Sequence, residues 1–410
     1  MTNLDAVVHG AAEIVTGGAT DRTLDRREDA ALAVTNGRVA AVGPTAEVVR
    51  EYPPENADRA YDATGRAVVP GFVDPHTHAV FAGDRSDEFE AKLRGKSYQE
   101  ILDEGGGILR TVGATQKTSE DTLRENLLGA LDVMAEHGST TVEVKSGYGL
   151  DTESELKLLR AIDAANERHP IDLVPTFMGA HAVPEGQTTD EYVEEVVDEQ
   201  IPAVAEQGVA EFCDVFCEEG VFDVDQSRRV LEAGAAHGLT PKVHAEELAR
   251  IGGTQLAAEL GATSADHLLH STSEDIDALA ERGVIPVVLP GTAFGLGDRY
   301  ADAETMLDRG APVAVATDFN PNCHAHSMGF AQSLCCVQMG MTPAEALLAA
   351  TEHAARAVDR NDVGRLDEGS KADLAILDEP SHVHIPYQFG TNVVDTVLKE
   401  GEPIARKRTR

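Results

Sequence analysis

Hydrophobic and polar positions follow two different patterns along the chain. Short apolar stretches bounded by turn residues fill the first seventy residues and return after about residue 360, at 5–15, 31–43, 61–70, 363–378 and 392–401. This texture is typical of β-strands, and Asn36-Gly37 predicts a hairpin turn inside the second stretch. We expect the two ends of the chain to pair into one small β-domain.

The middle of the chain alternates apolar runs with segments of helical period. Residues 123–138, 153–169 and 227–238 have the spacing of amphipathic helices. Eight apolar runs lie at 67–74, 140–147, 171–181, 210–220, 239–246, 262–268, 284–291 and 311–318. This repetition predicts an α/β fold, a (β/α)8 TIM barrel over residues 70–360, with residues 1–69 plus 361–410 forming a small β-sandwich domain. A doubly wound open sheet is the alternative architecture.

The ends of the predicted barrel strands carry side chains that suit a metal. His76 and His78 follow the first run two residues apart, so both point to one side of an extended chain. The fifth run ends near His244 and the eighth at Asp318. Three imidazoles and one carboxylate suit Zn²⁺ or iron (Fe³⁺) with a position left for water. We therefore predict these four residues as ligands of one ion per subunit.

The sixth run adds a residue that can move protons. His267 lies at its end, and an imidazole that titrates near neutrality is suited to proton transfer beside a metal-activated water. Asp318 can accept a proton while it holds the metal. The fourth run contains no lysine that could bridge two metals, so a mononuclear site is predicted. Lys145, which ends the second run, is expected to have a structural role.

Charge and cysteine content restrict the surroundings in which the chain works. The formal net charge is -37, from 71 Asp and Glu against 34 Lys and Arg, of which only nine are Lys. Such a balance argues against nucleic-acid binding and fits a salt-rich cytoplasm. Five scattered cysteines do not form a disulfide framework, and no apolar stretch has the length of a membrane span. A cytoplasmic protein without a membrane partner is expected.

These motifs follow Pro-Gly-Phe-Val-Asp at residues 70–74 and lie between β-rich ends of the chain. In this order they resemble those of the amidohydrolase superfamily, and the resemblance covers nearly the whole chain. Six segments are similar, within it, to the imidazolonepropionases: 73–89, 105–115, 142–150, 177–184, 244–247 and 317–322. The resemblance implies a small-molecule substrate, 4-imidazolone-5-propanoate, whose ring amide is hydrolysed to give N-formimino-L-glutamate in histidine degradation. It also implies a homodimer.

The same resemblance implies roles for residues around the metal. Arg85 would hold the carboxylate of the substrate's propionate arm, with a surface salt bridge as its alternative role. Tyr148 and His181 would contact the substrate from neighbouring loops. Glu247 would act in catalysis by holding a ring N–H, and its alternative is a first-turn glutamate of a helix. Asn320 would also contact ligand.

Two further substrate-binding positions depart from the family pattern. Asn322 and Cys323 stand where the family has Gly followed by Ser or Thr. Asparagine tolerates the left-handed backbone that glycine often supplies, so the expected backbone can be kept at Asn322. The glycines at 105–107 are expected to belong to a loop over the substrate, without catalytic residues.

Two other functions are compatible with a barrel of this kind. One is another mononuclear amidohydrolase, such as a nucleobase deaminase, which would share the metal ligands. Arg85, Tyr148 and residues 317–322 favour an acidic imidazolone instead. The other is an inactive barrel that binds a small acid, and it would lack a ligand or His267. None of these residues is missing.

Overall fold

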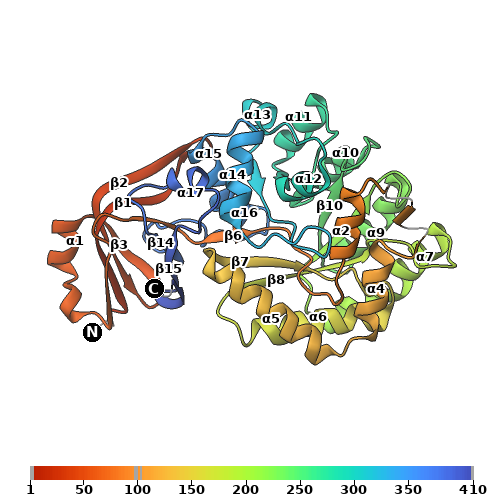
Figure 1. Ribbon diagram of the computed structural model, residues 1–410, viewed down its shortest axis with the longest axis horizontal. Coiled ribbons are helices and arrows are strands. Elements are labelled where there is room, and N and C mark those ends of the chain that lie inside the picture. Colours follow the sequence, from red (N-terminus) through yellow and green to blue (C-terminus); the bar gives the residue numbers. More distant parts are fainter. Residues whose placement is uncertain (1–3, 97–99, 102–103, 408–410) are drawn as a thin grey trace.

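The computed structural model describes residues 4–96, 100–101 and 104–407. Within these ranges, a parallel sheet joins eight strands in sequence order, and its labelled strands β6, β7, β8 and β10 lie inside the larger body in Figure 1. The strands are β6 (Phe72–Asp74), β7 (Ser139–Lys145), β8 (Asp172–Ala180), β9 (Phe212–Cys217), β10 (Thr240–Ala245), β11 (Ser264–His267), β12 (Ile285–Val288) and β13 (Ala314–Val315).

The first and last of these strands meet just beyond their carboxyl ends. Thr77 and Phe319 form a parallel bridge, and the amide of His78 donates to the carbonyl of Phe319 at 2.9 Å. The ring of strands is thereby brought together, which confirms the predicted barrel and not the open sheet. The bridge also places the segments after β6 and β13 side by side.

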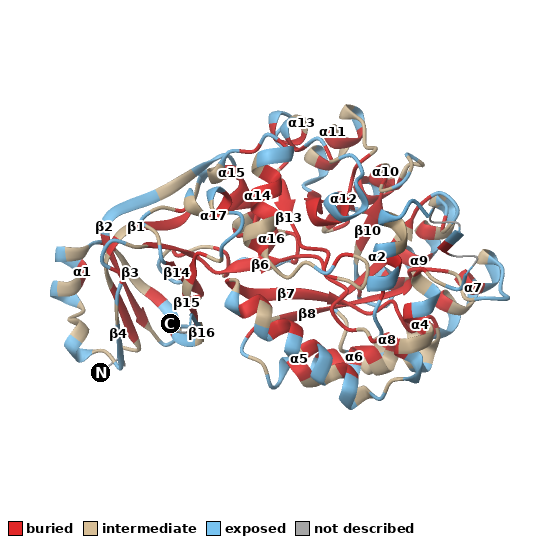
Figure 2. Cartoon of the chain, viewed as in Figure 1, coloured by how far each residue is buried: buried red, intermediate tan, exposed pale blue. Residues whose placement is uncertain are grey.

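Helices surround the barrel, and their buried faces lie toward the strands (Figure 2). Three of them, α5 (Glu120–Glu136), α6 (Thr152–Asn166) and α9 (Val224–Ala236), confirm the predicted helical segments. Each starts at a side-chain cap, from Ser119, Asp151 and Asp223. The others are α2 (Ser86–Leu93), α4 (Ile108–Lys117), α7 (Thr189–Glu195), α8 (Ile201–Gln207), α10 (Gly253–Leu260), α11 (Ser273–Arg282), α12 (Pro290–Leu296), α13 (Ala303–Asp308), α14 (Met328–Gln338), α15 (Pro343–Ala349) and α16 (Glu352–Arg356).

A second, separate sheet joins the two ends of the chain. It contains β1 (Ala6–Thr20), β2 (Thr23–Thr35), β3 (Arg38–Pro44), β4 (Arg59–Asp62), β5 (Ala67–Pro70), β14 (Leu374–Leu377), β15 (Val394–Lys399) and β16 (Glu402–Arg406). Strand β5 pairs antiparallel with β14, with Val69 opposite Ala375. The extra β-domain is thus built from both termini, and we propose residues 1–69 plus 361–410 as its extent and 70–360 as the barrel.

In and next to this domain, one local feature follows the sequence pattern and two depart from it. The Asn36-Gly37 turn has φ values of 52° and 70°, so the predicted hairpin is confirmed. Strand β2 starts at Thr23, earlier than predicted, because its polar first half pairs with β1 although it lacks an apolar alternation. The apolar run 67–74 is two strands, not one: Gly71 separates β5 of this sheet from β6 of the barrel.

Within the described ranges, none of the helices has the length and apolar character needed to cross a bilayer.

Candidate metal centre and substrate cavity

Four predicted metal ligands converge at the carboxyl ends of the barrel strands. Nε2 of His76 and Nε2 of His78 lie 3.5 Å and 3.7 Å from Oδ1 of Asp318. Nε2 of His244 lies 3.4 Å from Nε2 of His78. All four residues are buried, and Nε2 of His76 has no hydrogen-bond partner among the described residues.

These three separations suit neighbouring donors of one ion, and donor atoms of His76, His78 and Asp318 all lie within 4.8 Å of one another. Bonds of about 2.0–2.2 Å in a tetrahedral arrangement place neighbouring donors roughly 3.3–3.6 Å apart. Three imidazoles and a carboxylate form the donor set of zinc or iron rather than of a hard cation such as Mg²⁺. The residues present therefore fit a metal ion.

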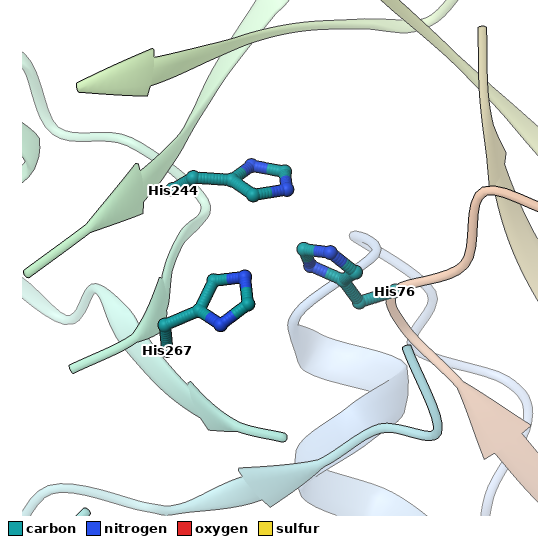
Figure 3. Close-up of side chains that lie close together, drawn as sticks. All are labelled: His76, His244 and His267. Carbon is teal, nitrogen blue, oxygen red and sulfur yellow. The ribbon is translucent and has the colours of Figure 1, made fainter. Parts of the chain in front are cut away.

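His267 lies beside this group. Its imidazole faces those of His76 and His244 in Figure 3, and one nitrogen of each lies within 4.8 Å of the others. The backbones of His267 and Asp318 have φ values of 77° and 51°, in the left-handed region that such residues rarely adopt. The turns that end β11 and follow β13 thus aim both side chains into the site.

Carboxylates lie behind two of the imidazoles of the metal site. Oδ2 of Asp266 lies 2.6 Å from Nδ1 of His76, and Oδ2 of Asp214 lies 3.0 Å from Nδ1 of His244. Asp266 thereby holds Nδ1–H of His76 and turns its Nε2 toward the metal site, whereas Asp214 makes a close ion-pair contact with His244 that is not aligned as a hydrogen bond. Burial lowers the pKa of His244, but the nearby Asp214 carboxylate outweighs it and raises that pKa overall.

Two lysines connect these carboxylates below the site. Nζ of Lys145 lies 2.7 Å from Asp214, 2.8 Å from Glu143 and 3.8 Å from Asp266. Nζ of Lys242 lies 3.1 Å from Glu143, and all five side chains are fully buried. Lys145 therefore has the structural role expected of it. The sequence contained a signal for these buried lysines and carboxylates, because they are charged residues within otherwise apolar strands. It did not reveal which of them pair with one another.

Glu247 lies close to His267, with Oε2 3.7 Å from Nε2 of the imidazole. No helix begins at Glu247, because α10 starts only at Gly253, so the alternative role as a first-turn helix residue is wrong. Burial raises the pKa of Glu247 to about 7 and lowers the pKa of His267 to about 3. Burial therefore keeps His267 neutral at neutral pH, and its pKa lies well below the near-neutral value expected from the sequence.

A cavity of 440 Å³ opens above the metal site. The predicted substrate residues that line it are Arg85, Tyr148, His181, Glu247, Asn320 and Asn322. The ring of His181 stacks on that of His78, with ring centroids 4.8 Å apart, and its Nδ1 lies 2.9 Å from the carbonyl of Gly147. Burial lowers the pKa of His181 to about 3 and raises that of Tyr148, so both are neutral.

Arg85 precedes α2 and is buried at the wall of the cavity. Its guanidinium pairs with Glu88, with Nε 2.9 Å and Nη2 2.8 Å from Oε2. Oε1 of Glu88 accepts from the amide of Gly107, the residue before α4, and Ile108 of α4 lines the cavity. Glu88 therefore links Arg85 to the glycine segment.

The segment after Asp318 differs from expectation in the backbone of Asn322 and in the position of Cys323. Asn320 closes a turn, since its Oδ1 accepts from the amides of Asn322 and Cys323. Asn322 does not adopt a positive φ, so the left-handed backbone that asparagine tolerates is not used there. The thiol of Cys323 lies 3.6 Å from the carbonyl of Thr317, and Cys323 does not line the cavity. The structure brings together all the other predicted site residues.

Sequence reasoning missed two residues near the cavity. Thr292 donates a short hydrogen bond to Asp318 and lines the cavity. Lys92, near the end of α2, also lines it and donates to Oδ1 of Asn322 at 2.6 Å. No motif marks either residue, since their neighbours lie far away in sequence.

Comparisons with known proteins agree with this geometry. The model of the Amidohydrolase family matches residues 67–404, and that of the Imidazolonepropionase-like composite domain of bacteria matches residues 30–54. The chain is 71% identical to the imidazolonepropionase of Haloarcula marismortui, over 99% of this chain and 97% of that protein. It is 60% identical to that of Halobacterium salinarum, over 98% of each, and 50% identical to that of Geobacillus kaustophilus, over 92% and 90%.

Solved structures share the fold at low identity. A zinc-bound adenosine deaminase from Xanthomonas campestris superposes with a TM-score of 0.76 at 20% identity, covering 98% of this chain and 93% of that one. The ochratoxinase of A. niger gives a TM-score of 0.73 at 17% identity, covering 99% and 96%. At such identities the likeness concerns the fold alone.

Proposed function

The chain belongs to the imidazolonepropionase family of amidohydrolases, and we propose that it opens the ring of 4-imidazolone-5-propanoate by hydrolysis to give N-formimino-L-glutamate. The observation that carries this conclusion is the 71% identity to a named imidazolonepropionase over 99% of this chain. The structure adds a cavity that is lined by Arg85 and lies above side chains that could hold a metal ion. A hydroxyl from water bonds to the ring carbonyl carbon, the adjacent C–N bond breaks, and the nitrogen takes a proton.

As an amidohydrolase the chain uses a metal cofactor. We propose one Zn²⁺ or Fe³⁺ ion per subunit, held by His76, His78, His244 and Asp318, whose donor separations support this set. When bound, such an ion polarises the ring carbonyl and activates water at neutral pH. Asp266 and Asp214 hold the imidazoles of His76 and His244 in the orientation that this requires.

Proton transfer and ring orientation belong to residues beside the ligands. His267 is neutral at working pH and takes the proton from water, then delivers it to the leaving nitrogen. Asp318, which accepts a hydrogen bond from Thr292, assists as a second acceptor. Glu247 lines the cavity next to His267 and orients the ring through a ring N–H.

Substrate binding uses other residues that line the cavity. Arg85 holds the propionate carboxylate, because a guanidinium offers two parallel donors to it. Tyr148, His181 and Asn320 line the cavity around the ring. Holding the arm that does not react aligns the ring carbonyl with the metal site, which lowers the barrier to hydrolysis.

We propose a homodimer, supported by an uncharged face. Segments 283–297, 319–344 and 380–394 contain no Asp, Glu, Lys or Arg in a chain of net charge -37. They carry α12, α14 and α17 (His384–Tyr387), where Phe294, Tyr387 and Phe389 are 58%, 75% and 69% exposed. An interface on this face avoids placing like charges of two strongly acidic copies against each other, and its exposed aromatic side chains supply apolar surface to bury, so this face seats a second copy.

Light scattering in concentrated KCl tests the dimer. The parent should have twice the mass of 43.6 kDa, and the double variant Tyr387→Asp/Phe389→Asp should be a monomer that keeps its fold. A parent that is monomeric, or a double variant that stays dimeric, would refute this surface.

The proposed location is the cytoplasm of a halophile. The five cysteines are free, as in a reducing compartment, and the acidic surface suits high salt. The function itself is tested by incubating the protein with 4-imidazolone-5-propanoate in concentrated KCl and identifying the product by nuclear magnetic resonance. N-formimino-L-glutamate is expected, and release of ammonia from an otherwise intact ring would indicate a deaminase instead.

A further inference from the structure

The charges that line the substrate cavity are unevenly distributed. Among the described lining residues, Glu247, Asp298 and Asp318 are acidic, whereas Arg85 and Lys92 are the basic ones. Arg85 immediately precedes α2 and Lys92 lies near its end, so both basic residues come from one segment of the chain. In a chain of net charge -37, an anionic ligand can be held only at such a local excess of cations.

Arg85 alone gives this segment little net charge. Both its Nε and its Nη2 lie within hydrogen-bond distance of the Glu88 carboxylate, and both side chains are buried. Glu88 therefore compensates much of the Arg85 charge, although Oε1 of Glu88 also lies 3.5 Å from Nη1 of Arg110. Part of the attraction of Arg85 for a second carboxylate is offset by the repulsion that Glu88 exerts.

Lys92 differs from Arg85 because its direct hydrogen-bond partner is an uncharged side chain. Its ammonium donates to the neutral amide oxygen of Asn322 at 2.6 Å, and none of the described carboxylates makes a direct ion pair with it, although the Glu88 carboxylate attracts it at longer range. The side chain is half-buried, and burial together with the Arg85 charge lowers the pKa of its amine. The negative charge of a carboxylate that enters the cavity would offset both effects.

We infer that Lys92 is a second binding residue for the propionate carboxylate, and that Asn322 holds its ammonium at the cavity wall. This inference rests on the proposed function, because that function supplies the carboxylate. The two cations complement each other: Arg85 fixes direction through its planar fork, and Lys92 contributes the uncompensated point charge. Lys92 thereby helps to select substrates with an acidic arm.

The test uses Lys92→Met in the full-length, metal-loaded enzyme. We expect kcat/KM for 4-imidazolone-5-propanoate to fall about tenfold, mainly through KM, since one charge-assisted bond to the ground state is lost. Lys92→Arg should recover most of this loss. Lys117→Met, at an exposed lysine outside the cavity, is the matched control and should behave like the parent.

A neutral substrate separates charge recognition from damage to the fold. The analogue whose arm ends in a carboxamide should be turned over equally by the parent and by Lys92→Met. An unchanged KM for the acidic substrate, or an equal loss for both substrates, would overturn the role of Lys92.

Failure of the proposed function has a different signature. If the parent did not turn over the imidazolone at all, the function would be wrong, and binding of 3-(imidazol-4-yl)propanoate measured by calorimetry would decide the role of Lys92. Weaker binding to Lys92→Met than to the parent would support it, and equal binding would overturn it.

Discussion

Oδ2 of Asp214 lies 3.0 Å from Nδ1 of His244, on the side of the imidazole away from the other metal ligands. Asp214 comes from β9 and His244 from β10, and these strands pair so that Asp214 lies opposite Lys242, two residues before the ligand. The register of two barrel strands therefore places Asp214 beside one of the proposed metal ligands.

Asp214→Asn should weaken metal binding by about 10- to 100-fold, because an amide holds the imidazole less firmly and makes it a poorer ligand. Competition with a chelator, followed by metal analysis, measures the effect. Asp225→Asn, an exposed aspartate on α9, serves as the control. Equal metal retention by both variants would show that Asp214 does not act on the metal.

His267→Asn separates a proton carrier from a ligand. The variant should retain the metal but lose about 10²- to 10⁴-fold in kcat, the usual contribution of a positioned acid–base group. Its metal content and its kcat are to be measured on the same sample. Loss of the metal together with activity would make His267 a ligand, which its proximity to His76 and His244 also permits.

Arg85→Met should reduce kcat/KM by about 10- to 100-fold, as expected when a charge-assisted pair worth about 1.5–3 kcal/mol is removed. Arg85→Lys should recover only part of the lost kcat/KM, because an ammonium lacks the two parallel donors of a guanidinium. Steady-state kinetics with the acidic substrate decide the matter. A parent-like kcat/KM in Arg85→Met would mean that Arg85 serves only its pair with Glu88.

Lys145→Met should destabilise the folded state by about 3–5 kcal/mol, since it leaves buried carboxylates without their cation. The carboxylates concerned are Glu143 and Asp214, both fully buried. Denaturant unfolding in concentrated KCl gives the free energy of unfolding. Lys117→Met, at an exposed position, should change it by less than about 0.5 kcal/mol. Equal stability of the two variants would argue against a structural role for Lys145.

The barrel and the convergence of His76, His244 and Asp318 were predictable because a periodic pattern fixes strand order, and strand order fixes which ends meet. The pairing of Lys145 with Asp214 was not, since it depends on which side chains of neighbouring strands point to the same layer. Lys92 could not be found either. Its partner Asn322 is 230 positions away, and only the folded loops bring the two together.

The remaining differences have the same origin in tertiary contacts. The first half of β2 is polar and becomes a strand because β1 pairs with it. Gly71 divides an apolar run that looks continuous, because the chain passes there from one sheet to the other. The backbone of Asn322 is set by hydrogen bonds to Asn320, not by the preference of asparagine for a turn.

The most direct test of the account is the ultraviolet absorbance of 4-imidazolone-5-propanoate during incubation with the protein in concentrated KCl. The chelator-treated protein should leave the ring chromophore intact, and addition of Zn²⁺ or iron at one ion per subunit should restore its loss. Absorbance that stays constant with a fully loaded site, or that falls equally without metal, would contradict metal-dependent ring opening by this chain.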